Sequence, residues 1–164
     1  EKLLDGHGGI KTKRIKHHTI FFELSYARGE HNIKVEINLR EFGSRYELLN
    51  YFGIGMKVMI KEDMFAHNIV AMYERLGKTN RDIYDVWFFS KEQWPINRDI
   101  LKTRTKMPLK DFLHACIEKL EKLPGRSILA GMGELLDEKQ KVWVKAKLRS
   151  DTIFQLKLLL DNEK

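Results

Sequence analysis

Apolar and polar residues alternate through much of the first third of the chain, with the period of two that is typical of β-strands. In TIFFELSYA (19–27), Phe22, Leu24 and Tyr26 share one face, and IKVEINLREF (33–42) alternates in the same way. The stretch RGEHN between them has the composition of a turn. We therefore predict an antiparallel hairpin with one buried face, followed by two further strands in RYELLNYFG and MKVMI.

From Asp63 onward the apolar positions recur with the period of an α-helix. In DMFAHNIVAMYERLG they fall at 65, 69, 72, 73 and 76, and Gly77 is a typical helix end. Further helices are predicted at about 82–92, 95–104 and 108–123, with two or three more after residue 127. The expected fold class is α+β, with a β-rich part over residues 1–62 and an all-helical domain over 63–164.

Bulk composition limits the class of protein. The hydrophobic share of 43% is enough for a core, but the longest apolar runs are too short to cross a bilayer, so no membrane association is expected. The single cysteine, Cys116, fits a reducing cytoplasm and lies on an apolar helix face, where we predict an inert core thiol. Because the sequence opens at Glu1 rather than at methionine, we expect a processed, trimmed or truncated product.

The formal charge of +7 is spread through the chain, with dense clusters in KTKRIKHH (11–18) and RDILKTRTK (98–106). Such clusters attract phosphates and nucleic acids through counterion release. A solvated basic face explains either cluster equally well, so charge alone does not identify a nucleic-acid site.

Three acidic residues are candidates for chemistry on phosphates. Glu36 projects from the polar face of the predicted hairpin, and Mg²⁺ sites use carboxylates held rigidly on strands. A solvent-facing glutamate on an amphipathic strand is the structural alternative. Asp82 and Asp85 lie three positions apart with Arg81 beside them, so they share a helix face. Their structural alternative is that Asp82 caps the helix and Asp85 lies in its first turn.

The segment DMFAHNIVAMYERLGKTNRDIYDVWFF (63–89) resembles the AbiEii/AbiGii-type nucleotidyltransferase toxin family. That family has an Ala-(Glu/His)-Lys-Leu helix, a later arginine, and then Arg-Asp-(Leu/Ile)-(Tyr/Phe)-Asp. The similarity extends over about residues 10–160. The positions that match the pattern are Ala66, Ala71, Glu74, Arg75, Arg81, Asp82, Tyr84 and Asp85.

The resemblance implies a polymerase-β-like core joined to a helical domain. Its activity would be Mg²⁺-dependent transfer of a nucleotide from an NTP to an RNA (tRNA among the candidates) or protein acceptor. The chain would be the toxin of a toxin–antitoxin or phage-defence pair, with a cognate antitoxin as partner. Glu36 would be a catalytic carboxylate and Mg²⁺ ligand, and Asp82 and Asp85 would be catalytic residues in a cleft shared with it.

The resemblance also implies nucleotide- or phosphate-binding roles for Asn68, Arg75, Arg81 and Lys34. Asn68 stands where the family has a helix lysine, and an amide supplies no charge, so weaker triphosphate binding is expected.

One departure from the family affects catalysis. In such cores a Gly-Ser turn positions the triphosphate and a strand with Asp-x-Asp follows it, and we expect neither motif in the 164 residues. We therefore expect the chain to correspond to the C-terminal portion of a nucleotidyltransferase and to be inactive alone. The alternatives are a non-catalytic module that binds nucleic acid or a partner, and an interaction domain that uses the C-terminal helices with Trp143 and Phe154.

Overall fold

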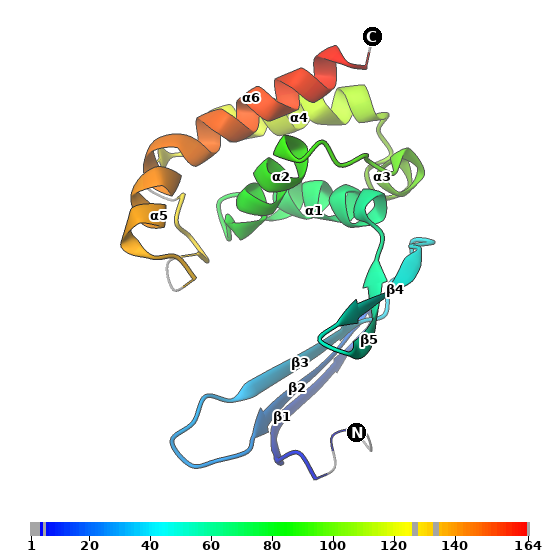
Figure 1. Ribbon diagram of the computed structural model, residues 1–164, viewed down its shortest axis with the longest axis vertical. Helices are drawn as coiled ribbons and strands as arrows, with labels where there is room; N and C mark the ends of the chain where they lie inside the picture. The colour runs from blue at the N-terminus through cyan, green and yellow to red at the C-terminus, as the bar shows by residue number, and fades with distance from the viewer. Residues whose placement is uncertain (1–3, 5, 126–127, 133–134, 164) are drawn as a thin grey trace. The chain divides into compact units, whose positions relative to one another are not determined.

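The computed structural model describes residues 4, 6–125, 128–132 and 135–163. The chain forms two compact units, Glu1–Glu41 and Phe42–Lys164, which we call the N-terminal unit and the helical unit. The predicted α+β class is confirmed, because small antiparallel sheets come first and helices follow (Figure 1). The change from strands to helices falls at residues 59–61. The assignment of residues 1–62 and 63–164 to separate domains stays a prediction.

The N-terminal unit contains one three-stranded antiparallel sheet in the order β1-β2-β3. Its strands are β1 (Gly9–Lys16), β2 (Thr19–Ser25) and β3 (Ile33–Asn38). The predicted hairpin between β2 and β3 is confirmed. Strand β1 was not predicted, because it offers only Ile10 and Ile15 as large apolar residues and is otherwise a basic cluster.

Cross-strand register divides this sheet into an apolar and a polar face. Phe22 pairs with Val35 and Leu24 with Ile33, and partners in an antiparallel pair project from the same face. Phe22 and Leu24 are buried, but Ile33 is 48% exposed and Tyr26 on the same strand face is also exposed. The prediction of one buried face therefore holds for Phe22 and Leu24 but not for Ile33 and Tyr26, because the described residues of this unit form a single layer that leaves part of the apolar face uncovered.

The helical unit begins with a separate hairpin, β4 (Tyr46–Tyr51) and β5 (Ile54–Met59), which confirms the two further predicted strands. The strands pair with each other and turn at Phe52 and Gly53, both of which have positive φ. Every residue of β4 is exposed, and the Phe52 side chain at the turn is 88% exposed.

The remainder of this unit is helical, and the predicted helices are confirmed. Their bounds are α1 (Lys61–Arg75), α2 (Arg81–Lys91), α3 (Arg98–Thr105), α4 (Leu109–Glu121), α5 (Glu138–Trp143), the π-helix η3 (Val144–Leu148) and α6 (Arg149–Asp161). Helix α1 packs against α2 and α3, and α6 packs against both α2 and α4. Large buried side chains such as Phe65, Ile69 and Phe112 fill the core between these helices.

The aromatic residues Trp143 and Phe154 of the C-terminal helices differ in how far they are packed against other residues. Trp143 packs on Trp87, with ring centroids 4.6 Å apart, and meets Tyr84 edge to face. Phe154 on α6 is exposed. Trp143 therefore contributes to packing within this unit, and the predicted interaction-domain role of the C-terminal helices stays open.

Asp63 joins three parts of the helical unit. Its side chain is fully buried in the first turn of α1. The backbone N–H of Arg45 donates to one carboxylate oxygen at 2.6 Å, and Arg45 Nη2 and Asn97 Nδ2 donate to the other at 2.9 and 2.6 Å. Asn97 also caps α3 by accepting from the backbone of Asp99 and Ile100. The carboxylate thus ties the segment before β4 to α1 and to the start of α3.

The Cys116 side chain is buried in α4, as predicted, and burial raises the pKa of its thiol to about 12. Because the thiolate is the reactive form, we expect iodoacetamide near pH 8 to leave Cys116 unmodified in the folded protein and to alkylate it in denaturant. Mass spectrometry of both reactions checks this. Rapid modification under native conditions would contradict an inert core thiol.

Candidate functional site

The two aspartates of RDIYD lie in the first turns of α2. The residue that precedes α2 as its N-cap is Asn80, so the alternative in which Asp82 caps the helix is wrong. Asp82 is only 2% exposed and accepts a hydrogen bond from Arg75 Nη2 at 2.7 Å. Arg75 is the last residue of α1, so this ion pair connects the end of one helix to the beginning of the next.

The pair Asp82 and Asp85 is electrostatically unfavourable as two charges. Burial raises the pKa of the Asp82 carboxyl, and the nearby charges of Arg75 and Arg81 only partly oppose this. Burial also raises the pKa of Asp85, and the negative charge of Asp82 raises it further. Raised carboxyl pKa values at neighbouring positions are typical of groups that accept or share a proton.

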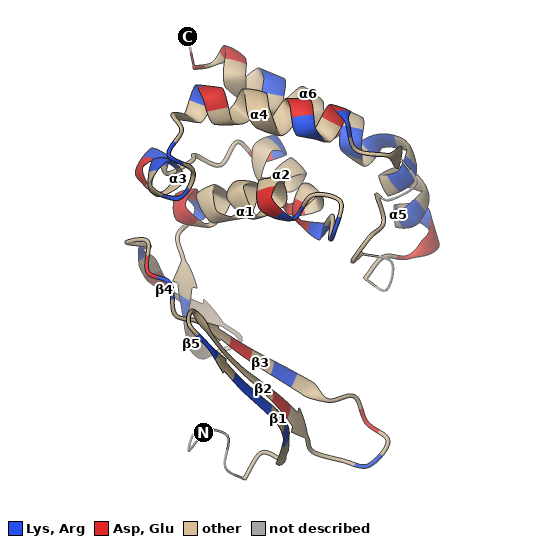
Figure 2. Ribbon diagram, turned by 180° about the vertical axis from the view of Figure 1, so that it is seen from behind, with Lys and Arg blue, Asp and Glu red and all other residues tan. Residues whose placement is uncertain are grey.

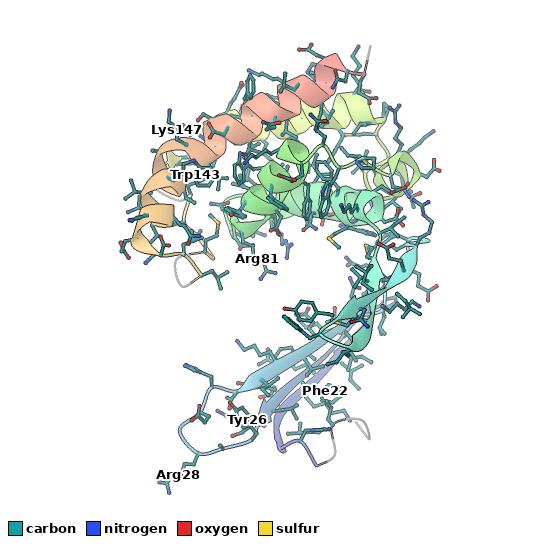
Figure 3. The ribbon with its side chains drawn as sticks, viewed as in Figure 1. Phe22, Tyr26, Arg28, Arg81, Trp143 and Lys147 are labelled. Atoms are coloured by element: carbon teal, nitrogen blue, oxygen red, sulfur yellow. The ribbon has the colours of Figure 1, made fainter. Side chains whose placement is uncertain are left out.

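Two atoms in this cluster are buried without a hydrogen-bond partner in the described part of the chain, namely Asp82 Oδ2 and Arg75 Nε. Buried polar atoms in native proteins usually have a partner, so an unpartnered carboxylate oxygen is a sign of a site completed by something else. Arg81 is exposed at the start of α2 (Figure 3). Its positive charge acts on both aspartates.

The predicted phosphate-binding residues have different surroundings. Arg75 is engaged with Asp82. Asn68 lies half-buried on α1, where its Nδ2 donates to the Met64 carbonyl at 3.1 Å. Arg81 makes no hydrogen bond or ion pair with another described residue, which leaves its guanidinium open to solvent. The phosphate-binding roles of these residues stay predictions.

Glu36 lies on the polar face of the N-terminal sheet. It pairs across the sheet with Phe21, which in turn pairs with Arg14. A hollow of about 180 Å³ is lined by Arg14, Lys16, Thr19, Phe21 and Glu36. Lys34 is exposed on the same face of β3, two residues before Glu36. The basic strand β1 and the mixed charges of β3 are visible in Figure 2. Two cations and an aromatic ring around one carboxylate suit a phosphate-bearing ligand better than a bare metal ion.

The sequence profile of the nucleotidyl transferase AbiEii toxin, Type IV TA system, matches residues 4–150, which include Glu36, Asp82 and Asp85. The chain belongs to the AbiEii family. No curated protein and no solved structure shows a significant match to it. The predicted family resemblance is therefore confirmed.

AbiEii membership assigns the chain to nucleotidyltransferase toxins of type IV toxin–antitoxin systems, for which a cognate antitoxin is the natural partner. Nucleotidyltransferases generally use an NTP and a divalent metal. Within residues 4, 6–125, 128–132 and 135–163, no group of three or more His, Cys, Asp or Glu side chains is placed to hold a metal ion. Glu36 beside two cations does not make a metal site by itself, so its assignment as a Mg²⁺ ligand stays a prediction.

The predicted site residues are distributed over both units. Glu36 belongs to the N-terminal unit, and Asp82, Asp85 and the arginines belong to the helical unit. Asp82 and Asp85 are brought together by α2. The expectation that all three acids face one cleft stays a prediction. Among the described helices of this AbiEii chain, none has the length and apolarity needed to cross a membrane.

The expectation that the chain lacks a Gly-Ser pair is wrong, because such a pair occurs at Gly43–Ser44. No Asp-x-Asp strand follows it, and the Ser44 hydroxyl lies 2.7 Å from His67 Nε2. Arg104 Nη1 lies 3.0 Å from His67 Nδ1, and burial lowers the pKa of His67. A neutral imidazole that accepts at Nδ1 carries its proton on Nε2, so it cannot take one from Ser44. Ser44 is therefore not activated as a nucleophile, and its contact with His67 is structural.

Proposed function

We propose that this chain contributes acceptor-activating and phosphate-binding residues to Mg²⁺-dependent transfer of a nucleotide from an NTP to an RNA or protein acceptor. The transfer would be the toxic activity of a toxin–antitoxin or phage-defence pair in the cytoplasm. The observation that carries the proposal is the buried Asp82 with an unpartnered oxygen beside Asp85, within RDIYD of an AbiEii-family chain.

Asp85 is the better proton acceptor of the two aspartates. It is half-buried and so reachable by an acceptor hydroxyl, whereas Asp82 is held by Arg75. A raised carboxyl pKa makes Asp85 a stronger base. The acceptor oxygen would form a bond to the α-phosphorus as the bond to pyrophosphate breaks, and the hydroxyl proton would pass to Asp85. Asp82 would act by positioning and by raising the basicity of Asp85.

Cationic side chains would bind the phosphates. Arg81 stands beside the two aspartates, and Arg14, Lys16 and Lys34 lie on the face of the sheet that carries Glu36. Phosphoryl and nucleotidyl transfer depend on positioning and on stabilising negative charge, which arginine and lysine side chains supply. Glu36 would complete a metal site only together with further carboxylates, because Mg²⁺ needs several oxygen ligands.

The test uses labelled NTPs, Mg²⁺ and total RNA or protein as acceptor. Because Asp-x-Asp is absent from the 164 residues, the chain alone is expected to label nothing. Co-expression with the Gly-Ser and Asp-x-Asp segment of another family member should produce labelling, and Asp85→Asn should reduce the rate roughly 100-fold or more. Asp99→Asn, an exposed acid on α3, is the control and should have no effect. Failure of the complemented protein to label any acceptor would contradict the proposal.

Restoring the family's helix lysine provides a separate prediction. Asn68→Lys is expected to tighten NTP binding roughly fivefold or more, because it adds a charge-assisted contact to phosphate. Isothermal titration calorimetry of the complemented protein measures the change, and Asn68→Gln, which adds length without charge, should leave the affinity unchanged. Equal NTP affinities for the lysine and glutamine variants would show that residue 68 does not contact the phosphates.

The second candidate is a non-catalytic module that binds nucleic acid. The basic strand β1, with four Lys or Arg residues among eight, is the observation that favours it. RNA binding by this chain alone should then weaken steeply as salt is raised. An RNA affinity that does not depend on salt would contradict an electrostatic interface.

A further inference from the structure

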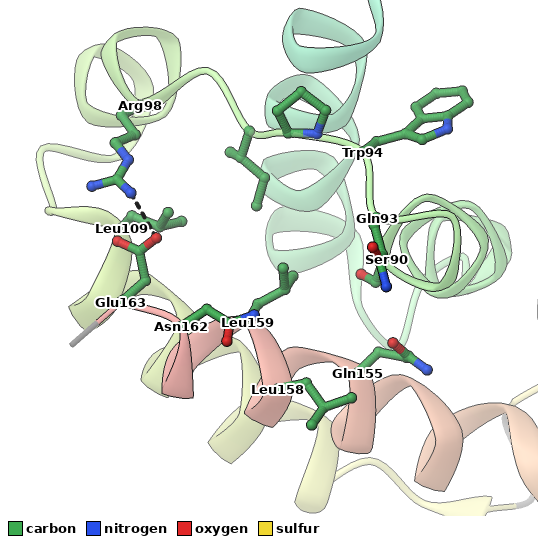
Figure 4. A pocket seen from close by; sticks show the side chains of 12 residues that line it. Ser90, Gln93, Trp94, Arg98, Leu109, Gln155, Leu158, Leu159, Asn162 and Glu163 are labelled. Atoms are coloured by element: carbon green, nitrogen blue, oxygen red, sulfur yellow. Dashed lines mark hydrogen bonds and ion pairs between the residues drawn. The ribbon is translucent and has the colours of Figure 1, made fainter.

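A cavity of about 510 Å³ lies in the helical unit at the end of α2 that is far from Asp82 (Figure 4). Its lining residues come from the end of α2, the segment that leads to α3, the first residues of α3 and α4, the C-terminal half of α6 and the two residues that follow α6. Ser90 in the lining follows Asp82 by 8 positions. The rise of an α-helix places Ser90 about 12 Å along α2 from Asp82 and about 8 Å from Asp85. Neither aspartate lines the cavity, so it is a distinct site.

The walls of the cavity are aliphatic rather than aromatic. Ile96, Leu109, Leu158 and Leu159 contribute apolar surface. Trp94 also borders the cavity, but its ring stacks on Phe89 with centroids 4.2 Å apart, and Figure 4 shows it pointing away from the other lining side chains. A flat ligand in this cavity would therefore pack between aliphatic side chains and not on the indole.

Three primary amides supply the polar groups of the lining, from Gln93, Gln155 and Asn162. None of these side chains forms a hydrogen bond with another residue in the described ranges, so each keeps a free donor and a free acceptor. The two charged lining residues, Arg98 and Glu163, neutralise each other in an ion pair at 2.7 Å. The cavity is thus suited to an uncharged ligand with several donors and acceptors.

We propose that this cavity binds a nucleobase, and adenine in preference to the others. Its volume lies within the usual range for small-molecule sites. The side-by-side donor and acceptor of an Asn or Gln amide match the N6 and N7 atoms of adenine. An extended peptide presents its donors and acceptors along a line, whereas these three amides come from separate segments that border one cavity, the exposed Gln93 and Asn162 at its rim and the half-buried Gln155 within it. The base could belong to a free nucleotide or to an unpaired residue of RNA, and neither source requires the transfer reaction.

The experiment follows the side-chain NH₂ resonances of Gln93, Gln155 and Asn162 in the ¹⁵N-labelled full chain during titration with adenosine, uridine, AMP and a short oligoadenylate. Adenosine should shift these resonances and bind roughly tenfold more tightly than uridine. Gln155→Met and Asn162→Leu keep the size of the side chain but remove the amide, and each should weaken adenosine binding roughly tenfold. Lys157→Met, an exposed change on the same helix, is the matched control and should leave binding unchanged.

Two results would overturn the proposal. One is the absence of shifts with about 10 mM adenosine, a concentration that would saturate even a site with a millimolar Kd. Another is tighter binding of N-acetylalanine methylamide than of adenosine, which would identify a peptide site. Tighter binding of oligoadenylate than of AMP, with the same resonances shifted, assigns the base to RNA, and equal binding assigns it to free nucleotide. These binding measurements do not require nucleotide transfer. Failure of the nucleobase proposal can therefore be distinguished from failure of the proposed function.

Discussion

Replacing Asp63 with alanine is expected to lower the free energy of unfolding of the helical unit by about 3 kcal/mol. The fully buried carboxylate accepts from the Arg45 backbone, the Arg45 guanidinium and the Asn97 amide. Alanine leaves these donors without their acceptor in a place where water replaces it poorly. Urea denaturation followed by far-UV circular dichroism measures the loss.

Glu62→Ala is the matched control for Asp63→Ala. Glu62 precedes Asp63 in sequence and also pairs with Arg45 Nη2, at 3.2 Å, but its side chain is 37% exposed. An exposed ion pair contributes little, so this substitution should cost about 0.5 kcal/mol or less. Equal losses for the two variants would show that Asp63 does not tie these segments together.

The pH dependence of the Asp63 effect has a definite sign. Burial alone would raise the pKa of this carboxyl, but the hydrogen bonds from Arg45 and Asn97 hold it below its ordinary value of 3.8. The folded state therefore binds this proton less tightly than the unfolded state, so the stabilisation is complete above pH 3.8 and is lost as the pH falls through the lower folded-state pKa. Asp63→Ala should lack this part of the acid-induced destabilisation.

Asp82→Asn is expected to stabilise the protein, in contrast to Asp63→Ala. It should raise the free energy of unfolding by about 1 kcal/mol at neutral pH. The amide keeps an oxygen for Arg75 Nη2 while it removes a buried charge and its repulsion with Asp85. Because the pKa of Asp82 is raised in the folded protein, its ionisation lowers stability as the pH rises from 3.8 through the folded-state value. The difference between variant and parent should therefore vanish below pH 3.8 and be complete at neutral pH.

Asp99→Asn is the control, because Asp99 also lies in the first turn of a helix but is exposed. Removing its charge weakens a favourable interaction with the helix dipole, so stability should fall by a few tenths, about 0.3 kcal/mol. A gain in stability on removing a charged residue is a sign of a site selected for function rather than for folding. A loss above about 1 kcal/mol for Asp82→Asn would instead make the Arg75 ion pair structural.

The sequence predicted the helices well because their apolar positions repeat strongly enough to define one buried stripe each. Phe65, Ile69 and Met72 of α1 fall on this stripe and are all buried. The strand β1 was missed because a basic strand that lies at the edge of a small sheet needs few apolar residues. Burial of the face that carries Ile33 could not be read from alternation, since alternation shows which residues share a face but not whether anything covers it.

The candidate site was only partly predictable. The RDIYD motif identified Asp82 and Asp85 by resemblance. Helix capping preferences suggested Asp82 as the N-cap, but Asn80 also suits that position and occupies it. The burial of Asp82 depends on tertiary packing, which the sequence does not show. The role of Arg75 as the partner of Asp82 follows from how the end of α1 meets the start of α2. The cavity lined by Gln93, Gln155 and Asn162 had no sequence signal, because its residues come from elements far apart in the chain.

Asp82 and Asp85 form an electrostatically strained carboxylate pair at the start of α2, and the proposed function depends on it. A ¹³C NMR titration of the side-chain carboxyl carbons measures both pKa values directly. Both carboxyls should titrate above 3.8, and the pKa of Asp85 should fall when Asp82→Asn removes the neighbouring charge. Titration of both groups at or below 3.8, with the pKa of Asp85 unchanged in the Asp82→Asn variant, would contradict a strained carboxylate pair.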